Sequence, residues 1–158
     1  MVALTHLAAV VFPMPLFSER PTRIESGKQV IVAEADDILC IRVQGYLTGT
    51  EARWAQSAMF DYGTLFGPYD IVVDIGNLLG FDSEARQIWV HATKPYQIRS
   101  LYAVNGSFAA KTLLWGIYRA GRVLQPAYFD FTFETFTTEA EARALIQTRR
   151  SAAKTSTA

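Results

Sequence analysis

Hydrophobic positions in the N-terminal half of the chain predict a hairpin followed by a helix. Two apolar runs, 29–33 and 38–43, flank a pair of aspartates, and short runs rich in Val and Ile around such a turn predict a β-hairpin. Thr48 and Glu51 follow with the spacing of a capping box. They predict a helix that begins after Thr48 and ends near residue 62.

The middle of the chain predicts a strand, a helix and a second strand. Residues 70–75 form an apolar run of the kind found in strands that are covered on both faces. From residue 83 onward, apolar residues recur at the spacing of one helix face until Pro95 ends the helix. Residues 99–104 predict the next strand. The apolar helix face consists of Ala85, Ile88, Trp89 and Ala92.

The C-terminal part predicts two helices around an aromatic strand. Ser107 is a candidate N-cap, and Gly121 is a candidate for the residue just past the end of the same helix. Residues 128–136 alternate phenylalanine with polar residues, as a half-buried strand does. Thr138 opens a second capping-box pattern, which predicts a last helix that ends near residue 147.

In this order the elements predict a mixed α/β fold. Strands that alternate with helices favour right-handed crossovers and a mostly parallel sheet with helical cover. We expect about four to five strands, the N-terminal hairpin supplying the antiparallel part, and about four helices. The 158 residues suffice for one domain with a sizeable core. We expect an apolar arm over 1–21, a folded domain over 22–150 and a small, polar, flexible tail over 151–158.

The apolar arm has two interpretations. It is hydrophobic enough for a signal peptide, but its first basic residue is Arg20 and no small-residue cleavage site precedes Pro13. Pro13 and Pro15 also interrupt it, so we expect no stable membrane span. We favour an extended arm docked on the domain over a targeting segment. The single cysteine, Cys40, excludes an internal disulfide and favours a reducing, cytoplasmic setting.

Charge and motifs argue against several functional classes. The chain has 15 Lys and Arg against 15 Asp and Glu, without the basic excess of a nucleic-acid binder. It contains neither a dinucleotide-binding glycine motif nor a P-loop. The two histidines, His6 and His91, form no cluster with metal-ligand spacing. We therefore expect no cofactor and no metal, and no paired catalytic residues recommend an enzyme.

One motif suggests a family. In IVVDIGNLLGFDSEA, over 71–85, an apolar strand ends at Asp74, and Asp82 and Ser83 open the following helix. This pattern resembles STAS domains (sulfate transporter and anti-sigma factor antagonist), in particular the bacterial SpoIIAA-like proteins. The resemblance extends over about 31–147 and implies the fold described above. It also implies a regulatory protein-interaction module whose partner is a kinase-like or sigma-pathway regulator.

The same motif departs from the family at the residue that is phosphorylated. In the family, the phosphoryl group is usually accepted by the second hydroxyl residue of the motif. Glu84 stands at that position here, so the phosphoserine switch does not carry over. Glu84 at the positive end of the helix dipole could hold a fixed, partly phospho-like state. Alternatively, Ser83 is phosphorylated one position early. The third interpretation is plain helix capping, with Asp82 as the N-cap and Glu84 in the first turn.

Aromatic residues offer a second candidate surface. In the helix after Ser107, Ala110, Leu113, Leu114 and Ile117 form the predicted inward stripe. Trp115 points away from this stripe, and Tyr118 lies between Trp115 and the stripe. Exposed aromatic pairs mark contact surfaces, so Trp115 and Tyr118 are candidates for binding a protein partner or a second copy of the chain. Alternatively, the N-terminal arm or the last helix covers them.

These observations favour a non-enzymatic regulatory module that binds a protein through Asp82, Ser83 and Glu84 or through the Trp115 surface. One alternative belongs to another class. SpoIIAA-like proteins are likened to Sec14-type lipid-transfer domains, and the many aromatics of this chain could line a pocket for a small apolar ligand or lipid. A closed core without a pocket would exclude this alternative, whereas a lipid that co-purifies with the protein would support it.

Overall fold

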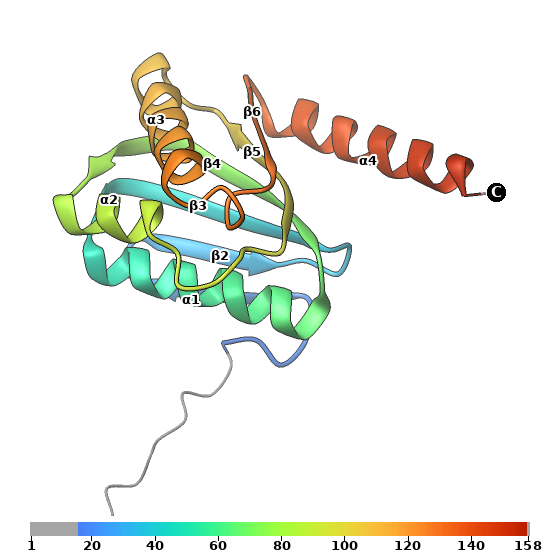
Figure 1. The fold of residues 1–158 in the computed structure, drawn as a ribbon, viewed down its shortest axis with the longest axis horizontal. Coiled ribbons are helices and arrows are strands. Elements are labelled where there is room, and N and C mark those ends of the chain that lie inside the picture. Colours follow the sequence, from blue (N-terminus) through green and yellow to red (C-terminus); the bar gives the residue numbers. More distant parts are fainter. Residues whose placement is uncertain (1–15, 158) are drawn as a thin grey trace, which may run out of the picture.

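A computed structural model describes residues 16–157 as one six-stranded sheet with helices on both faces (Figure 1). The strands lie side by side in sequence order. They are β1 (Thr22–Ser26), β2 (Gln29–Ala33), β3 (Ile38–Leu47), β4 (Tyr69–Phe81), β5 (Ile98–Val104) and β6 (Thr132–Phe136). The helices are α1 (Gly49–Phe66), α2 (Ser83–Val90), α3 (Phe108–Leu124) and α4 (Glu139–Ser156).

The pairing of the strands confirms the mixed α/β fold. The pairs β1–β2 and β2–β3 are antiparallel, and the three pairs from β3 to β6 are parallel. The predicted hairpin is β2 and β3. The sheet has one strand more than expected, because β1 pairs with β2 at the edge. Its residues alternate between half-buried and exposed and are mostly polar, so they carry no hydrophobic signal.

Alternate residues of the central strands contribute to two cores. Ile41 and Ile71 pack into the core under α1, α2 and α3, whereas Cys40 and Val72 pack into the core under α4. Successive side chains of a strand point to opposite faces, so both faces of the sheet are apolar. Burial raises the pKa of the Cys40 thiol to about 11, and Cys40 packs as a small buried hydrophobe.

Helix α4 extends beyond its predicted end and corrects the expected tail. It continues to Ser156, so residues 151–156 of the segment expected to be flexible are helical and exposed. In Figure 1 this part projects past the sheet. Ion pairs fix α4 along its length up to Arg150. Arg143 donates to both carboxylate oxygens of Glu34, at 2.9 and 2.6 Å, and Arg150 lies 2.8 Å from the buried carboxylate of Asp70.

Several predicted boundaries were wrong because packing overrides the local pattern. Strand β4 continues to Phe81, past the predicted end at residue 75, because it keeps pairing with β3 through two register shifts. Helix α2 ends at Val90, so Pro95 lies in the loop that follows. Strand β6 begins only at Thr132, so the first phenylalanines of the aromatic segment belong to a loop.

The helix starts were predicted correctly. Thr48 and Glu51 form the complete capping box of α1. Ser107 caps α3, and the hydroxyl of Thr138 accepts the backbone N–H of Glu141 at the start of α4. In this last case only half of the box forms, because the Glu141 side chain accepts from the residue before Thr138.

Gly121 does not end α3, as was predicted, but lies buried within it. The helix continues to Leu124 and is capped at Gln125. A Cβ atom at position 121 would overlap the ring of Phe129. The glycine is therefore required for the close approach of an aromatic ring and not for a left-handed backbone.

The described end of the N-terminal arm contacts α1. Phe17 is fully buried and packs edge-on against Tyr62, with ring centroids 6.0 Å apart. The backbone N–H of Leu16 donates to Asp61 at 3.1 Å. These contacts fit the docked interpretation at residues 16 and 17. The predictions that concern residues 1–15 lie outside the described residues and stay predictions.

Two glycines of α3 provide a matched test of this packing. We expect Gly121→Ala to destabilise the fold by about 1–3 kcal/mol, because the added methyl overlaps Phe129 in a packed core. The methyl group added by Gly116→Ala would point into open space. This variant should therefore stabilise the fold by about 0.5–1 kcal/mol, because alanine has the higher helix propensity. Urea denaturation of both variants measures the difference. Equal effects would contradict the close approach of Phe129.

Candidate functional site

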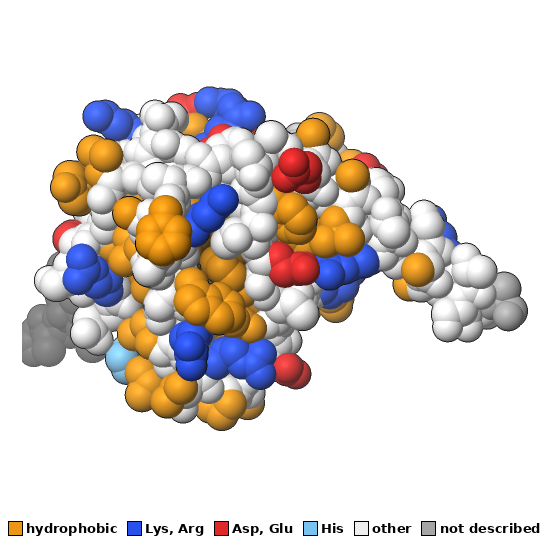
Figure 2. Space-filling view, turned by 90° about the horizontal axis from the view of Figure 1, so that it is seen from above, with side chains coloured by type: hydrophobic (Ala, Val, Ile, Leu, Met, Phe, Trp, Pro, Cys, Tyr) orange, Lys and Arg blue, Asp and Glu red, His pale blue; other side chains and the backbone are white. Residues whose placement is uncertain are grey.

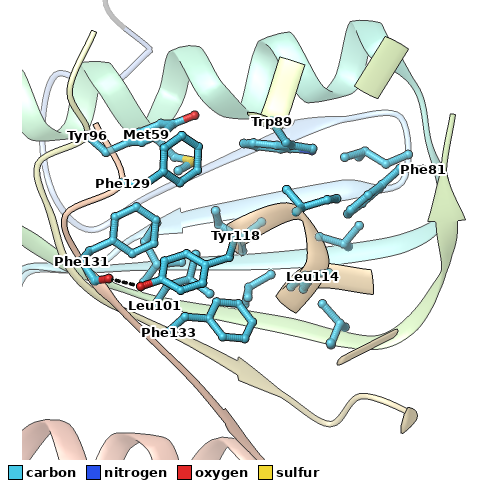
Figure 3. A pocket seen from close by; sticks show the side chains of 17 residues that line it. Met59, Phe81, Trp89, Tyr96, Leu101, Leu114, Tyr118, Phe129, Phe131 and Phe133 are labelled. Carbon is cyan, nitrogen blue, oxygen red and sulfur yellow. Dashed lines mark hydrogen bonds between the residues drawn. The ribbon is translucent and has the colours of Figure 1, made fainter. Parts of the chain in front are cut away.

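An apolar cavity lies between the sheet and helices α1, α2 and α3 (Figure 3). Its volume is about 110 Å³, and it is partly open to the surface. Strands β3, β4 and β5 form its floor, and none of the 17 lining residues is charged. The lining consists of Ile41, Val43, Leu47, Met59, Ile71, Val73, Ile75, Phe81, Trp89, Tyr96, Leu101, Leu114, Ile117, Tyr118, Phe129, Phe131 and Phe133.

The cavity forms because α2 is too short to cover the strands below it. Its 8 residues span about 12 Å, whereas the 13 residues of β4 span about 43 Å. Only Ala85 of α2 is fully buried. The apolar side chains of the central strands therefore need other cover. Trp89 from α2 and rings from two loops supply it, and these flat side chains leave space beneath them.

The loop rings form an ordered cluster. Tyr96, in the loop before β5, packs edge-on against Phe129 with ring centroids 5.6 Å apart. Phe129 stacks on Phe131 at 5.8 Å. The hydroxyl of Tyr118 in α3 donates to the backbone carbonyl of Phe131 at 2.6 Å, which holds this loop against α3 (Figure 3). The positions of the rings are therefore set by contacts with the helices.

Two glutamines fix the loops around the cavity. Gln125 accepts from the backbone N–H of Ala92 at 2.7 Å and donates to the carbonyl of Ala92 at 2.9 Å. Gln56 in α1 donates to the carbonyl of Ile88 and to the hydroxyl of Tyr96, at 3.0 and 2.8 Å. Burial raises the pKa of Tyr96 to about 12, so this hydroxyl stays neutral near pH 7.

The start of α2 joins two helices. One carboxylate oxygen of Asp82 accepts the backbone N–H of Ala85 at 2.7 Å, which is the predicted N-cap. The other accepts the N–H of Gly49 at the start of α1, at 3.2 Å. Glu84 forms an exposed ion pair with Arg53 of α1. Asp82 and Glu84 therefore have structural roles that account for their presence, while Ser83 is exposed.

The fold of this chain resembles that of one known structure. It is an uncharacterised protein of the DUF3478 family from Shewanella loihica PV-4, described as having a SpoIIAA-like fold. The match covers 77% of this chain and 98% of that protein, with a TM-score of 0.52 and 16% sequence identity. This chain has a SpoIIAA-like fold. The predicted resemblance to a STAS-like domain is thereby confirmed at the level of the fold. No protein-family model and no curated protein matches the chain.

Within the SpoIIAA-like fold, the two predicted aromatics of α3 are placed differently. Trp115 is 44% exposed, as expected, and packs on Tyr118 and Phe133 with ring centroids 5.5 and 5.6 Å apart. Tyr118 is only 8% exposed, so the expectation of an exposed pair was wrong. Its ring fills the core and lines the cavity. A partner-binding role for Trp115 stays a prediction.

Trp115 belongs to a wider apolar surface of the SpoIIAA-like fold. Figure 2 looks down on the end of the molecule where α3 lies, and hydrophobic side chains gather there around a hollow, with Lys and Arg beside them. Helix α3 has no acidic residue. Its exposed apolar residues are Phe108, Trp115, Val123 and Leu124.

Other candidate chemistry is sparse in this fold. His91 caps the end of α2 and is exposed. Within residues 16–157 no group of three or more His, Cys, Asp or Glu side chains is arranged to hold a metal ion. In the same part of the chain, no helix has both the length and the hydropathy needed to cross a bilayer.

Asp82 and Glu84 differ in what their removal should do. Asp82→Ala removes two backbone hydrogen bonds, so we expect the free energy of unfolding to fall by about 1–3 kcal/mol. Glu84→Ala removes an exposed ion pair and should change it by about 0–1 kcal/mol. Chemical denaturation measures both. A Glu84→Ala variant as unstable as Asp82→Ala would contradict the assignment of Asp82 as the main link.

Proposed function

We propose that this protein is a non-enzymatic binding module that holds a small apolar ligand in the cavity of its SpoIIAA-like fold. The observation that carries the proposal is the cavity itself, partly open and lined by apolar and aromatic side chains without a charge. Ligand pockets are concave and largely apolar, with a few polar groups that orient the ligand. This cavity lacks the convergent ionisable groups that catalysis requires, so binding without chemistry is the function we assign to it.

The size of the cavity indicates the size of the ligand. An engineered apolar cavity of about 150 Å³ in another protein stays dry and binds benzene. At about 110 Å³ and open on one side, this cavity suits a single ring or a short branched alkyl group that protrudes slightly. Burial of such a group is favourable by about 25 cal/mol per Å² of apolar surface.

Stability alone does not favour the cavity. Side chains that border an unfilled space lose the dispersion contacts that close packing would give them, so packing alone favours a filled core. Two glutamines and a buried tyrosine hydroxyl nevertheless fix the loops around the space. A preformed apolar space with fixed walls supports a binding role, because little ordering entropy is then lost on binding.

A second candidate function keeps the regulatory role that the resemblance implies. The observation that favours it is Trp115, which is exposed yet held in place by Tyr118 and Phe133. Rigid aromatic residues of this kind dominate the binding energy of protein interfaces. In this proposal the Trp115 surface, with Ser83 and Glu84, binds a protein partner such as a kinase-like or sigma-pathway regulator, or a second copy of the chain.

Toluene is a suitable first probe of the cavity. We expect wild type to gain about 1.4 kcal/mol of stability when toluene is present at ten times its Kd. Ile117→Phe places a ring inside the cavity and should abolish this gain, whereas Val123→Phe places the same side chain at an exposed position of α3 and should retain it. Thermal unfolding with and without toluene measures the effect. Equal gains in the two variants would contradict binding in the cavity.

The interaction surface has its own test. We expect Trp115→Asp to weaken self-association or partner binding by about tenfold or more, because it places a charge at an aromatic contact. Gln147→Asp, an exposed position on α4 at the other face of the sheet, is the matched control. Light scattering over a concentration series measures self-association. A variant that stays folded with an unchanged oligomeric state would exclude the homodimer through this surface.

A further inference from the structure

We propose that two copies of this protein associate through the free edge of β1, whose antiparallel pairing with the same strand of a second copy joins the two sheets into one. The two-fold axis of this dimer passes beside Ile24, so each copy contributes the same five residues. The inference goes beyond both proposed functions, because it uses neither the cavity nor the Trp115 surface.

Strand β1 forms one edge of the sheet and pairs on one side only. All of its residues, from Thr22 to Ser26, pair with β2. Within the described chain, no backbone N–H or carbonyl of residues 22–26 bonds to the backbone of any segment other than β2. An edge strand presents a row of unpaired N–H and C=O groups, which can pair with a strand of another chain. The edge of β1 is therefore available for a second copy.

The side chains of β1 are complementary to a second, antiparallel β1. When Ile24 faces the partner's Ile24, Arg23 faces the partner's Glu25 and Glu25 faces the partner's Arg23. Thr22 and Ser26 face each other in the same register. Opposite charges that face each other across a strand pair stabilise it. Within one strand Arg23 and Glu25 already lie 2.7 Å apart, so the four charged side chains of the dimer would alternate in sign.

The same charges select one register of the dimer. A slip by two residues keeps each side chain on its own face of the sheet, but it places Arg23 opposite the partner's Arg23, or Glu25 opposite the partner's Glu25. Like charges in facing positions destabilise a strand pair. A slip by one residue places Ile24 opposite a charged side chain and exchanges the two faces of one sheet. The sequence of β1 therefore favours pairing centred on Ile24.

The other edge of the sheet, β6, lacks this complementarity. Charged side chains on an edge strand are a common protection against association. The equivalent antiparallel pairing of β6 would centre on Glu134 and place it opposite the partner's Glu134. Strand β6 contains no cation that could face this glutamate. A closed dimer of two joined sheets is therefore expected at β1 and not at β6.

The apolar and charged residues of β1 lie on different faces of the sheet. Ile24 is half-buried, pairs with Ile31 and packs against the core under α1, α2 and α3. In the dimer the two Ile24 side chains would meet on this face and lose further apolar surface to water. The two-fold axis keeps the same face of both sheets on one side, because facing residues of a strand pair share a face. The dimer would therefore hold its two cavities on the same side of the joined sheet.

The length of the edge predicts a weak dimer. Each copy contributes the five residues of β1, against about 20–30 residues a side in a standard interface. The facing ion pairs are exposed, so each adds little to the backbone hydrogen bonds. We therefore expect a Kd of about 10 μM to 1 mM, which corresponds to a reversible association.

Charge reversal followed by mixing tests the facing pairs. Sedimentation of the full chain is measured at concentrations that bracket this Kd. We expect Arg23→Glu and Glu25→Arg each to weaken the dimer about tenfold or more, because each places like charges opposite one another. An equimolar mixture of the two variants should recover the wild-type affinity, since one strand then carries two glutamates and the other two arginines. Both side chains are 57% exposed, so the variants should fold. Lys154→Glu, at an exposed position of α4, is the matched control.

A second measurement tests the register by cross-linking. Arg23→Cys and Glu25→Cys are oxidised separately and as a mixture. Facing residues of an antiparallel pair have Cα atoms about 4.5–5.5 Å apart, which suits a disulfide, whereas the same residue of the two copies would lie about 7–8 Å apart. We expect the mixture to cross-link about threefold or more faster than either variant alone. The native thiol, Cys40, is buried and does not compete.

Three results would overturn the inference. One is a wild-type chain that stays monomeric over the whole concentration range. Another is a dimer that either charge reversal leaves unchanged, or that the mixture fails to recover. The third is cross-linking that is equally fast in the mixture and in the separate variants. The apolar-ligand function would stand in each case, because the cavity does not involve the edge of β1.

Discussion

The central constraint on this structure is that a sheet with two apolar faces must be covered by helices of unequal length. Helices α1 and α3 are long enough to flank the strands, but α2 between them has only 8 residues. The middle of the sheet is therefore covered by Trp89 and by rings from two loops. Rings that meet edge-on and stacked leave a space that branched aliphatic side chains would fill. The cavity follows from this geometry.

The loops that carry these rings are held by polar groups. Gln125 satisfies both backbone groups of Ala92, and Gln56 satisfies the carbonyl of Ile88. Each is a side chain to backbone bond at a place where no ladder or helix partner exists, Ala92 in the loop and Ile88 in the last turn of α2, and such bonds avoid the cost of unpaired backbone groups. The opposite face differs. There α4 packs Ala142 and Ile146 on the sheet, and arginine ion pairs hold it at its edges. The same sheet thus has one face with a cavity and one packed face.

The sequence predicted the features that are encoded locally. Capping residues marked the start of each helix, and apolar runs marked β2 to β5, because a cap or a strand is specified by residues that lie close together in the chain. The SpoIIAA-like fold followed from the order of these elements and one motif. What was missed depends on contacts between distant residues. Gly121 was predicted to end a helix because its partner, the ring of Phe129, is recognised only in the structure.

The candidate site was predictable to a similar extent. The motif at 82–84 correctly indicated a helix start, but the pairing of Asp82 with Gly49 and of Glu84 with Arg53 joins residues 31 or more positions apart. The richness in aromatics hinted at a pocket, although no pattern along the chain could place it. Tyr118 was predicted to be exposed from helical periodicity alone, and its hydrogen bond to Phe131 explains why it is buried.

The two proposals share helix α2. Its first turn carries Ser83 and Glu84, linked to α1, and its last turn carries Trp89, which lines the cavity. In a helix of two turns these groups move together, since the backbone hydrogen bonds between them leave no hinge. A ligand in the cavity would contact Trp89 and so would act on the element that presents Ser83 and Glu84. Such coupling requires the ligand to favour one position of α2 over another, because a ligand with equal affinity for both positions shifts nothing. Both ends of α2 are held, the first turn by the bond from Gly49 to Asp82 and the last turn by the bond from Gln56 to the carbonyl of Ile88, and these bonds oppose such a shift.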